Sequence, residues 1–291
     1  MESFIFGTFN PTLRKLIHGS MIFGLASFSV SAEWITLQEL NPDDQLVSKN
    51  WVTLKPTISA NNKSEQQEQI PDFSSYRDVK EKKEQFFKFM LPMVRTANQN
   101  IRNERRLLTT IEDRLQSGLV ATSEELLYLE QLGDRYRVQN KSEISGLLNE
   151  LLLRVDEVPA SLVLAQSATE SGWGTSRFAI EANNMFGVWC FREGCGIKPL
   201  KRDKERTYEV AKYDSVQESV EAYIHTINSH RAYEPLRRIR EKSRKNKSSP
   251  SGITLADGLL SYSEKGEEYV RQIKQLIKFN KLSRYNSKNN A

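Results

Sequence analysis

The sequence is poor in the residues that bind metals through nitrogen and sulfur. Of its 291 residues, only 2 are cysteine and 3 are histidine. Cys190 and Cys195, taken with His225 and His230, do not have the spacing of a known zinc site, and no further cluster of such residues exists. We therefore expect no metal site in this protein.

The chain also lacks a hydrophobic run of membrane-spanning length. The apolar stretch from Leu16 to Val30 is shorter than the ~20 residues that a spanning helix needs, and glycine and serine dilute it. Two basic residues precede it and small residues follow it, which is the pattern of an export signal. We expect residues 1–32 to be a signal peptide, so that the mature chain starts at Glu33, has no stable membrane span and is periplasmic or secreted. An uncleaved anchor is the alternative.

Export would place the two cysteines in an oxidising compartment. Cys190 and Cys195 are separated by only four residues, so they can close a small disulfide loop. Two free thiols are the alternative.

Charge of one sign does not dominate either, since the formal net charge is only +5. This charge permits attraction to an anionic polymer but identifies none, and we expect no nucleic acid partner. The most basic stretch, residues 237–252, is interpreted as a solvated loop, with a nucleic-acid-binding patch as the alternative.

Apolar residues at helical spacing predict the N-terminal architecture. Residues 33–75 are expected to be an extended segment and linker, because the stretch before Pro71 is too polar to form a core. A helical extension over 76–142 follows, with a long amphipathic helix from Val79 whose stripe Glu104 interrupts. A second helix is expected from Thr122 to Gly133, with Thr122 and Glu125 as its capping box.

The C-terminal half is predicted to combine helices with a short strand region. Apolar residues predict helices near 144–155, after Ser215 and around 269–277. Aromatic and β-branched residues between 185 and 213 predict a hairpin or small sheet. The tail over 284–291 is polar and is expected to fray.

One segment carries candidate chemistry. Residues 162–174 predict an apolar helix ending at a glycine, with Glu170 in the last turn. The helix C-terminus is partially negative and Trp173 would desolvate the carboxyl group, so both effects should raise the pKa of Glu170. A carboxylic acid still protonated near neutral pH can protonate a departing sugar oxygen. On spacing alone, a glutamate that caps the turn or pairs with Arg177 is the alternative.

Two linked motifs resemble the signature of bacterial endo-β-N-acetylglucosaminidases of the lysozyme superfamily. They are Ala-Thr-Glu-Ser-Gly-Trp-Gly at 168–174 and Asn-Asn-Met-Phe-Gly-Val-Trp at 183–189, and the similarity extends over 143–282. The resemblance implies a mainly α fold, with a lysozyme-like glucosaminidase domain at 143–283 that carries a small β-hairpin lobe and follows the helical extension.

The resemblance also implies roles for individual residues. Glu170 matches the catalytic acid of the family, and Asn184, Phe186 and Gly187 match a turn that borders the sugar cleft. Tyr262 and Tyr269 approximate a stretch with a tyrosine near the acid, although Tyr269 can equally be a core residue.

The aromatic residues of this region have two interpretations. Trp173, Phe186, Trp189 and Tyr213 are candidates for stacking on sugar rings. The alternative is that most of them belong to the core.

The second catalytic group is left open by the pattern. Glu205 or Glu209, on the strand region, could act as the base of an inverting reaction. The alternative is that the 2-acetamido group of the substrate attacks the anomeric carbon, with a tyrosine orienting it.

The reaction implied by the resemblance is hydrolysis of the β-1,4 bond on the reducing side of N-acetylglucosamine in peptidoglycan glycan strands, without metal or organic cofactor. One alternative is a lytic transglycosylase that cleaves after N-acetylmuramic acid. Another is a non-catalytic wall-binding or regulatory module on the same fold.

Overall fold

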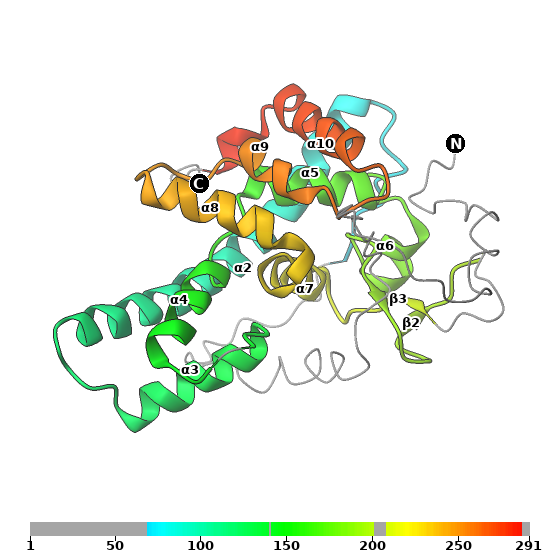
Figure 1. Cartoon of the computed structure of the whole chain (residues 1–291). Coiled ribbons are helices and arrows are strands. Elements are labelled where there is room, and N and C mark those ends of the chain that lie inside the picture. Colours follow the sequence, from blue (N-terminus) through cyan, green and yellow to red (C-terminus); the bar gives the residue numbers. More distant parts are fainter. Residues whose placement is uncertain (1–68, 140, 201–207, 287–291) are drawn as a thin grey trace, which may run out of the picture.

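The computed structural model describes residues 69–139, 141–200 and 208–286, and it is mainly helical with one small antiparallel sheet (Figure 1). The helical N-terminal region and the β lobe confirm the expected mainly α fold. The larger helices are α2 (Val79–Gln116), α3 (Ser123–Arg135), α4 (Ile144–Arg154), α5 (Ala160–Glu170), α6 (Arg177–Ala182), α7 (Val216–Ser229), α8 (Glu234–Lys245) and α10 (Glu267–Phe279). Short elements complete the list: α9 (Gly252–Leu255), η4 (Arg231–Tyr233), η5 (Ala256–Leu259) and η6 (Leu282–Tyr285).

Helix α2 crosses the molecule, from the side of α10 to that of α3 (Figure 1). Asp78 caps its first turn by accepting a hydrogen bond from the Glu81 backbone N–H. Glu104, which interrupts the apolar stripe, accepts a hydrogen bond from the Tyr136 hydroxyl and pairs with Arg135. The interruption therefore marks the contact with the end of α3.

Helix α3 begins as the sequence predicts and ends later. Thr122 and Glu125 form the expected capping box. The expected stop at Gly133 is wrong, because the helix continues to Arg135. Gly133 is buried inside the helix, where a β-carbon would lie 3.0 Å from Leu147 of α4. The glycine therefore allows close packing of two helices and does not end one.

The helical extension and the following domain share one hydrophobic core. The N-terminal half of α2 packs on α5 and α7, and α4 also contacts α2. Buried Phe86 and Met90 of α2 belong to the same cluster as Leu164 of α5 and Ile273 of α10. Removing the extension would therefore open the core around α5.

The basic stretch at 237–252 contradicts the expectation of a solvated loop, because much of it is helix α8. Arg237 and Arg240 are each only 1% exposed. Arg240 donates hydrogen bonds to the backbone carbonyls of Leu153 and Asp156, and its guanidinium group lies 3.6 Å from the Asp156 carboxylate. Arg240 thus fastens α8 to the loop before α5, and Arg237 donates to the carbonyls of Ile227 and His230 at the end of α7, so neither charge faces solvent.

Residues 284–286, the described part of the predicted fraying tail, are packed against the fold. Residues 282–285 form η6, which packs on α5. The Asn286 side chain accepts a hydrogen bond from the Ser161 backbone N–H in the first turn of α5. Residues 287–291 lie outside the described residues, as does the proposed signal at 1–32. No helix in the described part of the chain is long and apolar enough to cross a membrane.

Candidate functional site

Glu170 is the last residue of α5, as the sequence predicts. The helix stops because Gly172, Trp173 and Gly174 all have positive φ, which ends the regular hydrogen-bond pattern. The Ser171 hydroxyl stabilises this turn: it donates to the Ser167 carbonyl at 2.6 Å and accepts from the Gly174 N–H at 2.8 Å. The turn fixes the position of Glu170 through the backbone.

The side chain of Glu170 is half-buried and accepts a hydrogen bond from a tyrosine. Tyr269 of α10 donates its hydroxyl proton to Oε1 of Glu170 over 2.7 Å. Burial raises the pKa of Glu170 to about 7, while the Tyr269 hydrogen bond and the Lys265 charge act in the opposite direction. Arg177, a possible ion-pair partner, pairs with Glu181 instead. Glu170 is therefore a carboxyl group that exchanges its proton near neutral pH.

Four tyrosines approach Glu170 closely enough for its charge to raise their pKa values: Tyr223, Tyr233, Tyr262 and Tyr269. The rings of Tyr262 and Tyr269 are stacked, with centroids 5.3 Å apart. Burial is the largest cause of each raised pKa, so these phenols stay protonated at neutral pH. These four residues form a tyrosine wall, which can donate hydrogen bonds but carries no charge.

Trp173 has a different neighbourhood from the one expected. Its ring centroid lies 5.7 and 5.4 Å from those of Phe86 and Phe87 of α2, and the Lys83 ammonium lies over its ring at 5.0 Å. It also lines a shallow depression between α2 and α10 that includes exposed Phe279. The structure thus assigns Trp173 to the contact with α2, and tyrosines surround Glu170.

The Asn-Asn-Met-Phe-Gly turn is built by asparagine side chains. Asn183 ends α6 with a φ of 53°. Asn184 is 1% exposed, donates to the carbonyls of Val188 and Ala211, and accepts from the N–H groups of Phe186 and Val188. The amide of Asn184 is occupied by backbone groups, so this residue shapes the turn from inside.

The same turn is attached to the tyrosine wall. Phe186 stacks on Tyr223, with ring centroids 4.0 Å apart, and its carbonyl accepts a hydrogen bond from the Tyr262 hydroxyl at 3.3 Å. Gly187 has a φ of 65°, and a β-carbon there would meet open space. The structure therefore brings Glu170, Tyr262, Tyr269 and the 183–187 turn together.

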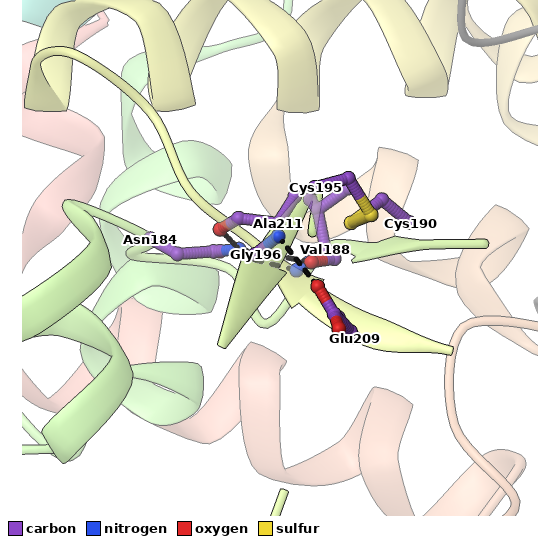
Figure 2. The surroundings of a disulfide bond; sticks show 7 residues. All are labelled: Asn184, Val188, Cys190, Cys195, Gly196, Glu209 and Ala211. Atoms are coloured by element: carbon purple, nitrogen blue, oxygen red, sulfur yellow. Dashed lines mark hydrogen bonds between the residues drawn. A yellow bond between two sulfur atoms is a disulfide. The ribbon is translucent and has the colours of Figure 1, made fainter. Parts of the chain in front are cut away.

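The β lobe is a three-stranded sheet in the order β1 (Trp189–Cys190), β3 (Glu209–Ala211), β2 (Gly196–Ile197), which is the small sheet that the sequence offers beside a simple hairpin. The Cys190–Cys195 disulfide is present, as predicted, and joins β1 to the start of β2 (Figure 2). The disulfide thus closes residues 190–195 into a small loop beside the central strand β3.

Glu209 and Glu205 are the two candidate carboxylates of this lobe. Glu209 is 1% exposed and its carboxylate accepts a hydrogen bond from the Gly196 N–H at 2.9 Å (Figure 2). It ties the central strand to its neighbour. Glu205 lies outside the described residues.

The remaining aromatic candidates lie at the edge of the lobe. Trp189 is half-buried and stacks on Tyr208, with centroids 4.2 Å apart. Tyr213 is 8% exposed, and its backbone pairs with Ala182 and with the side chain of Asn183. Trp189 is the more accessible of the two.

Sequence reasoning missed several residues around Glu170, namely Gln166, Tyr223, Tyr233 and Lys265. Gln166 was the easiest to find, since it lies four residues before Glu170 and so on the same helix face. The others come from distant elements, and no local pattern connects them to α5.

Comparisons with known proteins identify the family of this chain. The glucosaminidase family model, described as mannosyl-glycoprotein endo-beta-N-acetylglucosaminidase, matches residues 149–282. The chain is 32% identical over 201 residues to Protein bax of Escherichia coli strain K12. The aligned region covers 69% of this chain and 70% of that protein. No solved structure matches the chain. A glucosaminidase domain implies a glycan substrate and chemistry of the glycoside hydrolase type. The chain therefore belongs to the bacterial Bax-like proteins that carry a glucosaminidase domain.

Proposed function

We propose that this protein hydrolyses the β-1,4 bond on the reducing side of N-acetylglucosamine in peptidoglycan, with Glu170 as the general acid. The observation that carries the proposal is the half-buried carboxyl of Glu170, held at a helix end with a pKa of about 7. A glycosidic oxygen is a poor leaving group until it is protonated. A carboxyl with this pKa is substantially protonated at neutral pH and can accept the proton back after the bond breaks.

The environment of Glu170 fits this proton cycle. The tyrosine wall stays uncharged, so it does not hold Glu170 as a permanent carboxylate, as an arginine partner would. Tyr269 supplies one hydrogen bond, which stabilises the carboxylate formed when the proton leaves. Lys265 contributes a weaker attraction from an exposed position. These groups together favour a carboxyl that can occupy both protonation states.

We assign the second chemical role to the 2-acetamido group of the substrate. Its carbonyl oxygen attacks the anomeric carbon as the bond to the leaving oxygen breaks and Glu170 donates its proton to that oxygen. Water then opens the cyclic intermediate and gives its proton to the Glu170 carboxylate. Glu209 supports this assignment because its carboxylate is buried and bonded to the Gly196 N–H, which suits a structural role in the sheet.

The second role can be tested on the carboxylates and the intermediate separately. We expect Glu205→Gln to keep most of its activity. Glu209→Gln should lose activity only in proportion to stability, because it weakens the sheet. A thiazoline analogue of the cyclic intermediate should inhibit competitively. A loss of about a thousandfold in Glu205→Gln at unchanged stability would assign the base to that residue instead.

The deciding experiment compares the wild type with Glu170→Gln for release of reducing ends from purified peptidoglycan. Gln keeps the shape of the side chain but carries no transferable proton, so we expect activity to fall by about a thousandfold or more. Mass spectrometry of the products distinguishes hydrolysis from lytic transglycosylation, because the latter yields an anhydro sugar. Equal activity of the two proteins would remove Glu170 from the mechanism, and binding without products by the wild type would favour a wall-binding module.

We further propose export to the periplasm or the exterior, with cleavage after Ala32. The disulfide in the β lobe supports an oxidising compartment. N-terminal sequencing of protein isolated from a cell fraction is the test, and a mature chain starting at Glu33 is the expected result. A chain that begins at Met1 in the membrane fraction would mean an uncleaved anchor.

A further inference from the structure

A buried hydrogen-bond chain leads from α7 through α5 to Glu170. The Tyr223 hydroxyl donates to Oε1 of Gln166, and Nε2 of Gln166 donates to the Tyr269 hydroxyl at 3.0 Å. Tyr269 in turn donates to Oε1 of Glu170. Gln166 is 0% exposed, and the two tyrosines are 2% and 1% exposed. No bulk water competes for these bonds at Gln166.

The direction of this chain follows from the number of protons. A phenol has one proton to donate, and Tyr269 receives an N–H from Gln166, so its own proton is free to go only toward Glu170. Tyr223 has the same limitation and gives its proton to the carbonyl end of the Gln166 amide. The amide is thereby oriented from one side, since the stack on Phe186 holds the Tyr223 ring. The Nε2 group of Gln166 in turn orients the Tyr269 hydroxyl by donating a hydrogen bond to it.

We propose, on the basis of the proposed function, that Gln166 is a positioning residue that places the transferable proton of Glu170 on Oε2. Oε1 already accepts the Tyr269 proton, so a proton on that oxygen would face another donor. The acid proton therefore resides on Oε2, from which it is transferred to the leaving oxygen. Gln166 acts only through Tyr269 and does not itself contact the substrate.

The location of Gln166 argues against a purely space-filling role. Every other residue from Leu162 to Ala168 in α5 is apolar or small, and all of them are buried. An amide at such a position costs free energy unless both of its ends are bonded. A leucine or methionine would fill the same space without that requirement. The two bonds that Gln166 makes both lie on the path to Glu170.

Other titratable groups face Glu170 and enter the test. They are Tyr233 of η4, Tyr262 and Lys265 before α10, Tyr269 of α10, and Tyr223 of α7. The phenols stay neutral at neutral pH, and neither Gln166 variant alters Lys265. A change in the titration of Glu170 in a Gln166 variant is therefore attributable to the Tyr269 bond.

The experiment uses Gln166→Met, Tyr269→Phe and the double variant in the full chain. Losing the N–H from Gln166 weakens the Tyr269 bond to the carboxylate. We therefore expect the pKa of Glu170, followed by carbon NMR of its carboxyl, to rise by about one pH unit. We expect kcat on soluble peptidoglycan fragments to fall about tenfold with little change in KM. The double variant should match Tyr269→Phe, because Gln166 has no other route to Glu170.

Two further variants keep the test decisive. Gln166→Glu has the same shape, and burial raises the pKa of the new carboxyl. It therefore stays protonated near neutral pH, accepts from Tyr223 and donates to Tyr269 as the amide does, and should keep most of the wild-type kcat. Asn98→Leu is the control, because Asn98 is a buried amide that bonds only the Val158 backbone. It should lower thermal stability and leave the titration of Glu170 unchanged.

The outcomes separate the two proposals. An unchanged Glu170 titration in Gln166→Met, a loss of kcat in Gln166→Glu as large as in Gln166→Met, or effects of Gln166→Met and Tyr269→Phe that add would overturn the positioning role. The NMR readout does not require turnover. If Glu170→Gln is as active as the wild type, but the pKa of Glu170 rises in Gln166→Met as expected, the proposed hydrolysis is refuted. The hydrogen-bond chain from Gln166 to Glu170 is then still supported.

Discussion

The ring of Phe73 lies so close to Gly174 that a β-carbon on this glycine would be 2.8 Å from Cε2 of Phe73 and closer still to Cδ2. Phe73 is 1% exposed and precedes α2, so it lies outside the residues matched by the family model. Gly174 closes the turn after Glu170. Phe73 belongs to the segment 33–75 that is expected to be a linker, yet it is part of the core and supports the turn that positions the candidate acid.

This contact predicts different costs for two glycines with similar backbones. Gly174 and Gly187 have φ values of 75° and 65°, but only Gly174 has a ring against it. Gly187→Ala should cost only the strain of a left-handed alanine, about 1 kcal/mol. Gly174→Ala should cost at least about 2 kcal/mol more, because Phe73 must move. Denaturant unfolding of both variants measures the difference.

The role of Phe73 can be isolated in a double variant. Phe73→Ala by itself should cost about 3–5 kcal/mol, as for other buried rings. In that background, the added cost of Gly174→Ala should fall to the value found at Gly187. If the cost of Gly174→Ala stays the same without the ring, the close approach is not its cause.

The pKa of Glu170 predicts a pH-dependent effect on stability. The folded-state pKa is about 7 and the ordinary value is 4.5, so the buried carboxyl costs nothing below about pH 4.5, destabilises the fold increasingly as pH rises from 4.5 to 7, and adds no further cost above that range. Gln does not titrate. The stability of Glu170→Gln relative to wild type should therefore increase between pH 4.5 and 8, by about 2 kcal/mol after allowance for partial exposure.

Urea unfolding at a series of pH values measures this difference. The control is Glu264→Gln, which removes the same charge from an exposed position. Its stability relative to wild type should stay constant over the same range. A difference for Glu170→Gln that does not change with pH would mean that the carboxyl titrates at its ordinary value.

The charge of Lys265 should affect the pH at which activity is lost, and this effect should depend on salt. Its charge lowers the pKa of Glu170, so Lys265→Met should raise that pKa and move the high-pH loss of activity to higher pH. The shift should be a few tenths of a pH unit, since Lys265 is exposed. The difference between the two proteins should shrink at high ionic strength. Salt then screens the lysine charge in the wild type, so that the wild type titrates like Lys265→Met. Lys281→Met, a loss of the same charge elsewhere on the exposed surface, is the control that should leave the profile in place.

Local patterns predicted the parts of the fold that local physics determines. The stripe after Val79 and the Thr122 capping box each give a helix where expected, because spacing and capping act within a few turns. The four-residue gap between the cysteines led to the observed disulfide. The end of α5 at Glu170 was equally readable from the glycines that follow it.

Features that depend on distant partners were not readable. Arg237 and Arg240 look like surface charges, yet both donate to backbone carbonyls inside the fold, and Arg240 also lies beside the Asp156 carboxylate. Trp173 lies near Glu170 in sequence, but its ring packs on α2, more than eighty residues earlier. The four tyrosines around Glu170 come from α7, η4, the segment before α10 and α10 itself, which only the tertiary fold brings together.

The shared core predicts that the region matched by the family model does not fold without the extension. Four buried side chains of α2, Phe86, Phe87, Met90 and Val94, pack into the core, and each stabilises the fold by roughly 1.5–3 kcal/mol. Their sum is comparable to the whole stability of a typical domain, about 5–15 kcal/mol. A fragment of residues 143–291 should therefore show no cooperative thermal transition and bind a dye that reports exposed apolar surface. A fragment of residues 69–291 keeps α2 and is the control, with a cooperative transition expected. If 143–291 unfolds cooperatively at the same temperature as 69–291, the helices after residue 143 are stable without α2, and the support that Phe73 gives to the Glu170 turn is dispensable.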